Sequence, residues 1–483
     1  MAGLSKSRIL AWKQCPKRLW LQINQPDLAN WGDAQSVRME TGNTVGEVAR
    51  DLWPDGVLIE GDDLKAALAD TQSALASGKP IFEATFQHEG TLVRVDLLIP
   101  TENGYRMAEV KSAASVKPYY LSDAAVQAWV SRQNGVALSS IEIAHIDTSF
   151  VYPGGGDYQG LFKHVDVTAD IAPLEPQVSQ WISGARATLA GGLPDCSPGE
   201  QCNDPFECPF LAHCSPPDAN PAEYPVEILP YGRGLPAALR AEGYADLRDV
   251  PRERFDNARH IRVWDVTQSG QPELLKAAGD ELRALPYPRY YLDFETYQFV
   301  IPQWVGTRPY AQQTFQWSCH IESADRSLSH AYFLADGSGD PRREFAERMV
   351  AALGDSGPVI VYNAAFERSR MQELARDFPD LAPALDAVIA RIFDLLPLAR
   401  TNYYHPDMRG SWSIKAVLPT IAPDLAYDNL EVADGGMAQD AFAEIMNPET
   451  SSDRRSELHN ALLQYCERDT FAMVRIAHYF EGI

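Results

Sequence analysis

Two sets of acidic side chains in this chain have spacings that suit divalent-metal chemistry. In the first set, Asp96 lies in VRVDLLIP, and Glu109 and Lys111 follow in RMAEVKS. Carboxylates of this kind can hold Mg²⁺ or Mn²⁺ against a phosphate. Glu109 and Lys111 are two residues apart, so on a strand they share a face. The Lys111 ammonium could then orient an attacking water and offset the charge that develops during hydrolysis.

The second acidic set lies in the last part of the chain. Asp293 and Glu295 occur in YYLDFETY, where a strand would point both carboxylates to one side. Glu367 ends the segment NAAFE, and Tyr465 and Asp469 are four residues apart on one face of an expected helix. Four carboxylates could hold two metal ions about 4 Å apart, one activating a water and one stabilising the leaving oxygen. Tyr465 would position that water.

Four of the chain's seven cysteines lie within a short stretch, Cys196 to Cys214. Cys202, Cys208 and Cys214 repeat with five residues between each pair, and nearby prolines interrupt any helix. Cys15, in WKQCPKRLW, is the candidate for a fourth ligand. Cys196 competes with Cys202, and we favour Cys202. Thiolates bind iron–sulfur clusters or zinc, and spacing alone does not choose between them.

A lone N-terminal cysteine with a distant trio resembles the iron–sulfur RecB-like nucleases, among them AddB-type helicase–nucleases and CRISPR-associated RecB-like nucleases. The resemblance implies a [4Fe–4S] cluster on Cys15, Cys202, Cys208 and Cys214, although the even spacing of the trio departs from the family. The first acidic set likewise resembles the D…E-x-K arrangement of the restriction-endonuclease-like fold. For the cysteines, the alternatives to an iron–sulfur cluster are a zinc site and four unrelated buried thiols.

This first resemblance also implies roles for two further residues. Glu47, in GNTVGEVARDL, occupies the helix position where these nucleases often carry a metal-binding His or Glu. Gln127, in DAAVQAWV, resembles the glutamine that contacts DNA near the metal. The family's tyrosine four residues later is Ser131 here, so Tyr119 or Tyr120 could substitute.

The second acidic set resembles the D-E-D-D exonucleases, such as RNase D and polymerase proofreading domains, whose fold is of the ribonuclease-H type. Glu367 replaces the Asp of the family's second motif, and Tyr465 and Asp469 match the third. The resemblance implies release of nucleotides from a 3′ end. Asp394 is a further candidate acid, or else a capping residue. The segment SWSIKAVLP resembles the helix before the third motif.

The first helix is a candidate strand-binding face, because cations could contact phosphates and aromatic rings could contact bases. A solvated helix face with two core tryptophans is the alternative. The residues concerned are Lys6, Arg8, Lys13, Lys17 and Arg18, with Trp12 and Trp20 interleaved.

Three blocks are expected to position these residues: 1–217, a connector over 218–286, and 287–483. In the connector, 235–251 could be a phosphate-binding helical hairpin or only a spacer. The expected helices are 5–20, 37–52, 122–133, 342–353, 364–378 with Asn363 as its cap, and 456–480; the expected strands are 91–99, 105–110, 141–148, 160–167, 289–294, 313–321, 329–334 and 358–362. This alternation predicts an α/β protein, with a restriction-endonuclease-like N-terminal domain and a ribonuclease-H-like C-terminal domain.

The bulk composition fits such a protein. Its 483 residues suffice for two or three domains. The net charge of −24 argues against loose, charge-driven binding of nucleic acid but leaves room for a local basic channel. The sequence contains neither a membrane-spanning apolar stretch nor a signal-peptide core, so we expect a cytoplasmic protein without a membrane partner.

These observations together predict a Mg²⁺- or Mn²⁺-dependent nuclease with two sites. DNA is the favoured substrate, in repair, recombination or defence against foreign DNA. The alternatives are an RNA-processing exonuclease and a nucleic-acid-binding protein whose nuclease folds are inactive.

Overall fold

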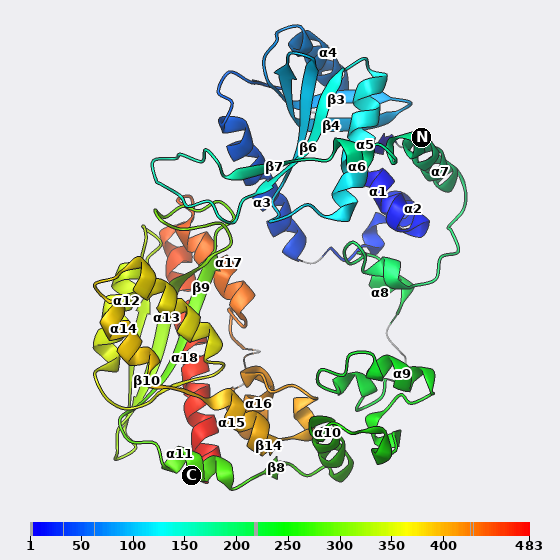
Figure 1. The fold of residues 1–483 in the computed structure, drawn as a ribbon. Helices are drawn as coiled ribbons and strands as arrows, with labels where there is room; N and C mark the ends of the chain where they lie inside the picture. The colour runs from blue at the N-terminus through cyan, green and yellow to red at the C-terminus, as the bar shows by residue number, and fades with distance from the viewer. Residues whose placement is uncertain (1–2, 32, 62, 217–220, 426, 428) are drawn as a thin grey trace. The chain divides into compact units, whose positions relative to one another are not determined.

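The chain forms two compact units in the computed structural model. The structure describes residues 3–483 except 32, 62, 217–220, 426 and 428, and it describes only the backbone of residues 33–40. The first unit comprises Met1–Ala219 and Phe299–Tyr310, and the second comprises Asn220–Gln298 and Ala311–Ile483 (Figure 1). Each unit mixes helices with a sheet, so the chain is an α/β protein as expected. Among the described residues, no helix has the length and apolar character needed to cross a bilayer.

A seven-stranded sheet forms the centre of the first unit, in the order β2-β3-β4-β5-β6-β7, with β1 beside β4. The expected hairpin is present as the antiparallel pair β4 and β5, and β6 runs parallel to β5. The strand β3 was not foreseen. The strands are β1 Leu4–Ser5, β2 Val57–Leu58, β3 Ile81–His88, β4 Thr91–Thr101, β5 Gly104–Lys111, β6 Leu138–Ile146 and β7 Phe162–Asp166.

Helices cover both faces of this sheet. Ala124 and Val126 of α5 share a core with Val95 and Met107, whereas Ala49 of α3 packs with other sheet residues in a separate cluster. The helices are α1 Lys6–Gln14, α2 Pro16–Asn24, α3 Asp33–Asp51, α4 Leu64–Leu75, α5 Pro118–Gln133, α6 Thr168–Ile171, α7 Val178–Ala190 and α8 Leu211–Cys214.

The single helix expected over 5–20 is wrong, because α1 and α2 are separated at Cys15. Cys15 is extended, with φ −162° and ψ 121°. The ring of Pro16 disfavours a helical conformation in the residue before it, and proline is well tolerated as the first residue of the next helix. The break therefore leaves Cys15 between two helices.

A five-stranded sheet forms the centre of the second unit, in the order β11-β10-β9-β12-β13. The first three strands are antiparallel, and β12 and β13 run parallel to β9. Helices α12, α13 and α14 lie on one face and α17 and α18 on the other (Figure 1). The bounds are β9 Arg289–Gln298, β10 Gln312–Glu322, β11 Leu328–Leu334, β12 Val359–Val361, β13 Ile392–Asp394, α12 Arg342–Leu353, α13 Ala365–Asp377, α14 Ala382–Ile389, α15 Leu395–Asn402, α16 Ile414–Ile421, α17 Gly435–Met446 and α18 Ser452–Glu481.

Residues 226–285, which lie within the connector expected over 218–286, belong to the second unit. Val226, Leu239 and Val263 share a hydrophobic core with Tyr404 and Val474, so this block buries its apolar side chains against the C-terminal part of the chain. The possible hairpin at 235–251 has one α-helix followed by a 3₁₀ turn. The block's elements are α9 Leu235–Ala241, α10 Ala258–Ser269, β8 Glu273–Leu274 and α11 Ala277–Arg283, with β8 paired to β14 Tyr403–Tyr404.

The loop between β9 and β10 belongs to the first unit. The amide of Tyr152 donates to the carbonyl of Thr307 (3.0 Å), and the amide of Gly306 donates to the carbonyl of Tyr152 (2.9 Å). Ile301 is buried with Val45 and Leu161. The chain therefore leaves the second unit directly after the strand that carries Asp293 and crosses back for β10.

A buried charge network ties β9, β10 and α18 together. Arg289 Nη1 lies 2.9 Å from Glu481 Oε1, and both side chains are almost fully buried. Glu322 accepts hydrogen bonds from His478 (2.7 Å), Arg326 (3.0 Å) and the Tyr291 hydroxyl (3.0 Å). Burial by itself would raise the pKa of Glu322, but hydrogen bonds from His478 and Arg326 outweigh it and lower the pKa to about 2.

We expect Glu322→Gln to lower the free energy of unfolding by about 3 kcal/mol, because His478 and Arg326 lose the buried counter-charge that accepts their hydrogen bonds. The lowered pKa also means that this stabilisation is complete above about pH 4.5 and is lost as the pH falls toward 2. Urea unfolding of the full chain measures both effects. Glu347→Gln, which removes the exposed pair with Arg343, should change stability by less than about 1 kcal/mol. Equal effects of the two substitutions would contradict the assignment.

Candidate active sites and cysteine cavity

The first acidic set lies on two neighbouring strands, β4 and β5. Val95 faces the core on the α5 side, whereas Leu97 faces the core on the α3 side. Regular alternation would place both on one face, so β4 is irregular at Asp96. The Asp96 Oδ2 atom accepts a hydrogen bond from the Val110 amide at 2.7 Å. The irregularity thus turns the Asp96 carboxylate toward β5, between Glu109 and Lys111.

Two lysines converge on Glu109. Lys111 Nζ lies 2.6 Å from Glu109 Oε1 and 2.8 Å from Asp123 Oδ2. Lys6 Nζ, from the start of α1, lies 2.7 Å from the same oxygen of Glu109. Sequence reasoning placed Lys6 only in the basic helix face and did not identify Asp123. No local pattern reveals either role, because α1 and α5 contribute them through packing.

Gln127 lies in the first site, against Glu109. Its side chain is fully buried, and its Nε2 donates to Glu109 Oε2. Gln127 therefore orients Glu109, and its expected contact with DNA stays a prediction. Tyr120 lies beside the site, with its ring centroid 5.1 Å from Lys111 Nζ.

Glu47 does not line the first site, contrary to expectation. Its side chain is exposed, whereas Asn43, Gly46 and Arg50 of the same helix line the cavity over Asp96 and Glu109. Residues 46 and 47 are about 100° apart around a helix, so only one can face the sheet. The cavity has a volume of about 230 Å³, and its third acidic residue is Glu83. Glu83 lies on β3 with a φ of +54°, which marks an irregularity in that strand. It was missed because β3 was not foreseen.

Burial and like charge determine the protonation of this site. They raise the pKa of Asp96 to about 8, burial contributing most and Glu109 next. Burial would also raise the pKa of Glu109, but Lys111 and Lys6 outweigh it and hold that pKa well below its usual range. Without a metal ion the site therefore pairs a readily protonated Asp96 with an ionised Glu109.

The predicted basic face does not form one surface. Lys6 enters the first site, and Lys13 Nζ donates to Ser122 Oγ (2.7 Å) and lies 3.5 Å from the Trp181 ring centroid. Arg18 is buried over Phe206, and Arg8 donates to the carbonyl of Gly3. Lys17 and Arg18 line the cysteine cavity instead. These contacts favour a structural role for the residues named as strand-binding, namely Arg8, Lys13, Lys17 and Arg18.

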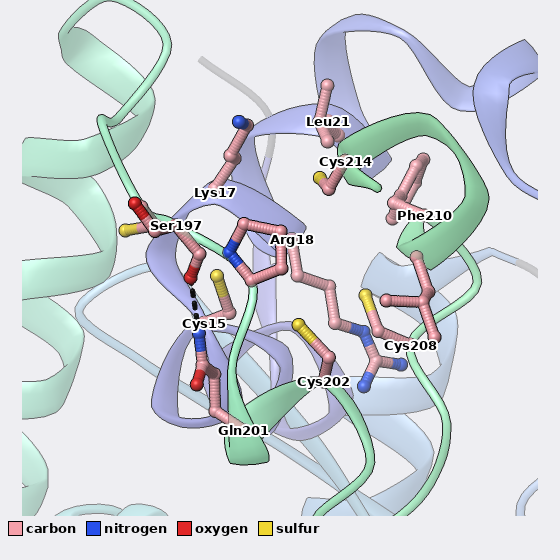
Figure 2. A pocket seen from close by; sticks show the side chains of 13 residues that line it. Cys15, Lys17, Arg18, Leu21, Ser197, Gln201, Cys202, Cys208, Phe210 and Cys214 are labelled. Atoms are coloured by element: carbon pink, nitrogen blue, oxygen red, sulfur yellow. Dashed lines mark hydrogen bonds between the residues drawn. The ribbon is translucent and has the colours of Figure 1, made fainter. Parts of the chain in front are cut away.

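Five cysteines line one cavity in the first unit: Cys15, Cys196, Cys202, Cys208 and Cys214. Figure 2 shows Cys15 from the α1–α2 break opposite Cys202, Cys208 and Cys214 from the end of the unit. Burial raises the pKa of the Cys15 and Cys208 thiols, and Cys196 beside Cys15 raises the pKa of Cys15 further. The expected trio and its distant partner are therefore brought together, and Cys196 stays close enough to compete.

The second acidic set lines a cavity of about 250 Å³ in the second unit. Asp293 and Glu295 come from β9, Glu367 from α13 and Asp469 from α18, so all four predicted carboxylates converge. A β-bulge in β10 between Thr314 and Gln316 lies opposite Glu295. Glu367 is 2% exposed, and its Oε2 is buried without a protein hydrogen-bond partner.

Aromatic and basic side chains complete this cavity. Tyr465 lines it as predicted, and Tyr427 donates its hydroxyl to Asp469 Oδ1. Lys415 Nζ lies 5.2 Å from the ring centroid of Tyr465 and donates to the carbonyl of Ala433. Lys415 belongs to the segment SWSIKAVLP that the sequence singled out, whereas nothing in the sequence indicated Tyr427.

Asp394 is a capping residue and not a fifth acid of the site. Its carboxylate accepts from the amides of Leu396, Asn363 and Ala364, each at 3.0 Å. Asn363 has φ +82° and its side chain does not cap the following helix, so the predicted Asn363 cap is wrong. Asp394 instead fixes the turn that leads into Glu367.

Buried carboxylates in the second site repel one another. Burial, and then the charge of Asp469, raise the pKa of Glu295 to about 8, and burial raises the pKa of Glu367 to about 8. Burial also raises the pKa of Asp469 to about 6, with Tyr427 acting in the opposite direction. Ligand atoms of Asp293, Glu295 and Cys466 lie within 4.8 Å of one another, a spacing that could hold a metal ion.

Comparisons with known proteins give one family match, which lies in the second unit, and two relatives. Residues 290–413 match a domain of unknown function (DUF2779), a stretch that includes Asp293, Glu295 and Glu367. The chain is 25% identical over 243 residues to the uncharacterized protein UU173 of Ureaplasma parvum, covering 46% of this chain and 35% of that protein. It is 28% identical over 209 residues to an uncharacterized MG366 homolog of Mycoplasma pneumoniae, covering 39% and 31%. The chain thus spans about a third of the curated relatives it matches.

The raised pKa values predict a pH-dependent stability in the absence of metal. Asp469, Glu295 and Glu367 favour protonation in the folded chain, so their contribution is complete below about pH 4 and is lost as the pH rises toward 8. In EDTA we expect the free energy of unfolding to fall by a few kcal/mol over this range. Thermal melts should show Mn²⁺ restoring stability at pH 8 and not at pH 5. A Glu295→Gln Asp469→Asn variant that keeps the parent's pH profile would contradict this account.

Proposed function

We propose that this protein is a metal-dependent nuclease with two hydrolytic sites. A restriction-endonuclease-like, RecB-type domain would occupy the first unit and a D-E-D-D exonuclease domain of the ribonuclease-H type the second. The observation that carries the proposal is the second cavity, where Asp293, Glu295, Glu367 and Asp469 converge with Tyr465 from three separate elements. Three antiparallel strands followed by two parallel ones support the ribonuclease-H-like assignment.

The donor chemistry of the second cavity fits divalent cations. Four carboxylates supply the oxygen ligands that Mg²⁺ and Mn²⁺ prefer, and the unpartnered Glu367 Oε2 has an unused acceptor position. Bound cations would neutralise the buried charges, lower the pKa of a bound water and stabilise the leaving oxygen. Tyr465 and the four carboxylates would position the water and the scissile phosphate, and Lys415 would offset negative charge near Glu295.

The first site would act similarly with fewer ligands. Asp96, Glu109 and Glu83 line one cavity and could hold a cation there. Lys111 would orient the water and stabilise charge on the phosphate, since it already lies against Glu109 and Asp123. Gln127 would keep Glu109 in place through its hydrogen bond.

The cysteine cavity fits a thiolate-bound inorganic centre, which we propose is a [4Fe–4S] cluster on Cys15, Cys202, Cys208 and Cys214. Four thiols from opposite ends of the unit line one space, and burial raises the pKa of Cys15 and Cys208, so cations would be needed to hold these groups as thiolates. Such a centre would close the domain by joining α1 and α2 to the segment after α7.

We further propose DNA, single-stranded or with free ends, as the substrate, in repair, recombination or defence. Lys111→Ala should slow cleavage by the first site at least about a hundredfold, because charge on the phosphate loses its stabilising ammonium. Asp293→Ala should slow 3′-end trimming to a similar degree. End-labelled single- and double-stranded DNA and RNA with Mn²⁺ report each activity and the preferred nucleic acid.

The exposed residues Lys65 and Asp440 supply matched controls, since neither lines a cavity described above. Lys65→Ala and Asp440→Ala should digest like the parent. If Asp293→Ala trims 3′ ends at the parental rate, the second unit is a binding scaffold. If neither Lys111→Ala nor Asp293→Ala changes any cleavage, the two-site proposal fails.

The cluster has its own prediction. Protein purified without oxygen should be brown and contain about four iron and four sulfide per chain, as a four-cysteine [4Fe–4S] cluster requires. Cys202→Ser should lower iron content and thermal stability more than Cys196→Ser does. A colourless, stable protein with one zinc would overturn the cluster assignment. If Cys196→Ser instead lowers iron content and stability more than Cys202→Ser, then Cys196 and not Cys202 is the ligand.

A further inference from the structure

A second cavity adjoins the carboxylate cavity of the second unit. It has a volume of about 490 Å³ and shares Tyr362, Asn363 and Ile414 with the carboxylate cavity as common walls. The remaining wall comes from the block 226–285, from α15 and from the segment before α16. A molecule whose end lies among Asp293, Glu295, Glu367 and Asp469 can therefore continue into this space, which we call the side groove.

The chemistry of the side groove differs from that of the rest of the chain. Its eleven lining residues include two tyrosines, one tryptophan and one arginine, and none of them is acidic. The whole chain carries a net charge of −24, so an acid-free wall beside four carboxylates is unusual. Such a wall attracts an anionic ligand more than the surrounding surface does, and its rings suit flat, apolar groups.

An exposed tyrosine forms the outer edge of the side groove. Tyr231 is 70% exposed, more than any other large apolar side chain among the described residues. The Arg259 guanidinium lies 5.2 Å from its ring centroid, and Arg400 Nη2 donates to its hydroxyl at 3.3 Å. Two cations thus hold an aromatic ring in solvent without a hydrophobic core beneath it.

The backbone fixes this ring as well. Tyr231 has φ +54°, a conformation that costs a non-glycine residue on the order of 1 kcal/mol or more and is often retained for function. The Pro230 carbonyl accepts from His260 at 2.9 Å. At Gly410, with φ +78°, a Cβ atom would lie 1.6 Å from the Ile228 carbonyl oxygen, so only glycine allows this close approach. The edge is therefore preorganised.

From this geometry we infer that the side groove binds the single-stranded nucleotides that precede the 3′ terminus of the substrate, with one base stacked on Tyr231 and a phosphate beside Arg400. The inference rests on the proposed nuclease function of the adjoining carboxylates. Stacking on an aromatic ring is tolerant of base identity, and arginine is a natural partner for phosphate. The block 226–285 then serves as part of the substrate site and not as a spacer.

Binding is tested apart from cleavage. In an Asp293→Ala background, fluorescence anisotropy with labelled single-stranded DNA and RNA oligonucleotides should show Tyr231→Ala raising Kd about tenfold, equivalent to about 1.4 kcal/mol. Tyr231→Phe should weaken binding far less than Tyr231→Ala, because it keeps the ring and its contact with Arg259 and loses only the hydroxyl bonded to Arg400. Arg400→Gln should lower the slope of log Kd against log salt by about 0.7, as loss of one phosphate contact predicts. Tyr332→Ala is the matched control, since Tyr332 is 53% exposed on β11 and lies outside the groove.

Kinetics separate this inference from the nuclease proposal. Tyr231→Ala should raise KM about tenfold on an oligonucleotide with little change in kcat, and it should leave hydrolysis of thymidine 5′-monophosphate p-nitrophenyl ester unchanged, since that substrate is too short to reach the groove. If the parent cleaves but Tyr231→Ala matches Tyr332→Ala in Kd and KM, the inference is overturned and the nuclease stands. If the parent cleaves nothing yet Tyr231→Ala still weakens binding, the groove stands and the nuclease proposal falls.

Discussion

Burial of carboxylates beside one another, with the repulsion that follows, is the constraint around which both candidate sites are organised. In the second unit Asp293, Glu295, Glu367 and Asp469 come from β9, α13 and α18 into one cavity. Burial raises the pKa of all four, and the charges of neighbouring carboxylates raise the pKa of Asp293 and Glu295 further. A sheet with helices on both faces holds them there regardless of that repulsion, because the hydrophobic cores fix where each element ends. Under the proposed function, a divalent cation would stabilise this site strongly, because the fold already holds the four carboxylates together.

The two units resolve the same repulsion in different ways. In the first, Lys6 and Lys111 lie against Glu109, so protein cations supply much of the compensating charge. In the second, Lys415 alone among the residues lining the carboxylate cavity carries a positive charge, and Glu367 keeps an unpartnered oxygen. Under the proposed function, the second site would depend more on bound cations than the first.

Candidate functional groups in both units lie where regular structure is interrupted. Asp96 lies at an irregularity of β4, Glu295 opposite a bulge in β10, and Cys15 between two helices separated by Pro16. Tyr231 adopts a positive φ at the edge of the side groove. Regular strands and helices repeat their side-chain directions, so an interruption is the means by which one side chain can be turned away from that repeat.

What the sequence determined by itself was the local part of each site. The two-residue spacing of Asp293 and Glu295 and the four-residue spacing of Tyr465 and Asp469 were readable because strand and helix periods fix side-chain direction over a few residues. The cysteine trio was readable because its members cluster in the sequence. The fold class and most sheet and helix positions followed from the same periods. Glu47 was wrongly chosen because the helix was recognised without knowing its rotation against the sheet.

Only the tertiary structure decided which distant groups meet. It brought Lys6 to Glu109, Tyr427 to Asp469 and Glu83 to the first site, and it gave Gln127 a buried partner. It also made the expected connector part of the second unit and placed Tyr231 at the edge of the side groove, next to the carboxylate cavity. The physical reason is that a buried charge or ring takes its partner from whichever element packs against it, and that packing depends on hydrophobic contacts across the whole chain and not on spacing along it.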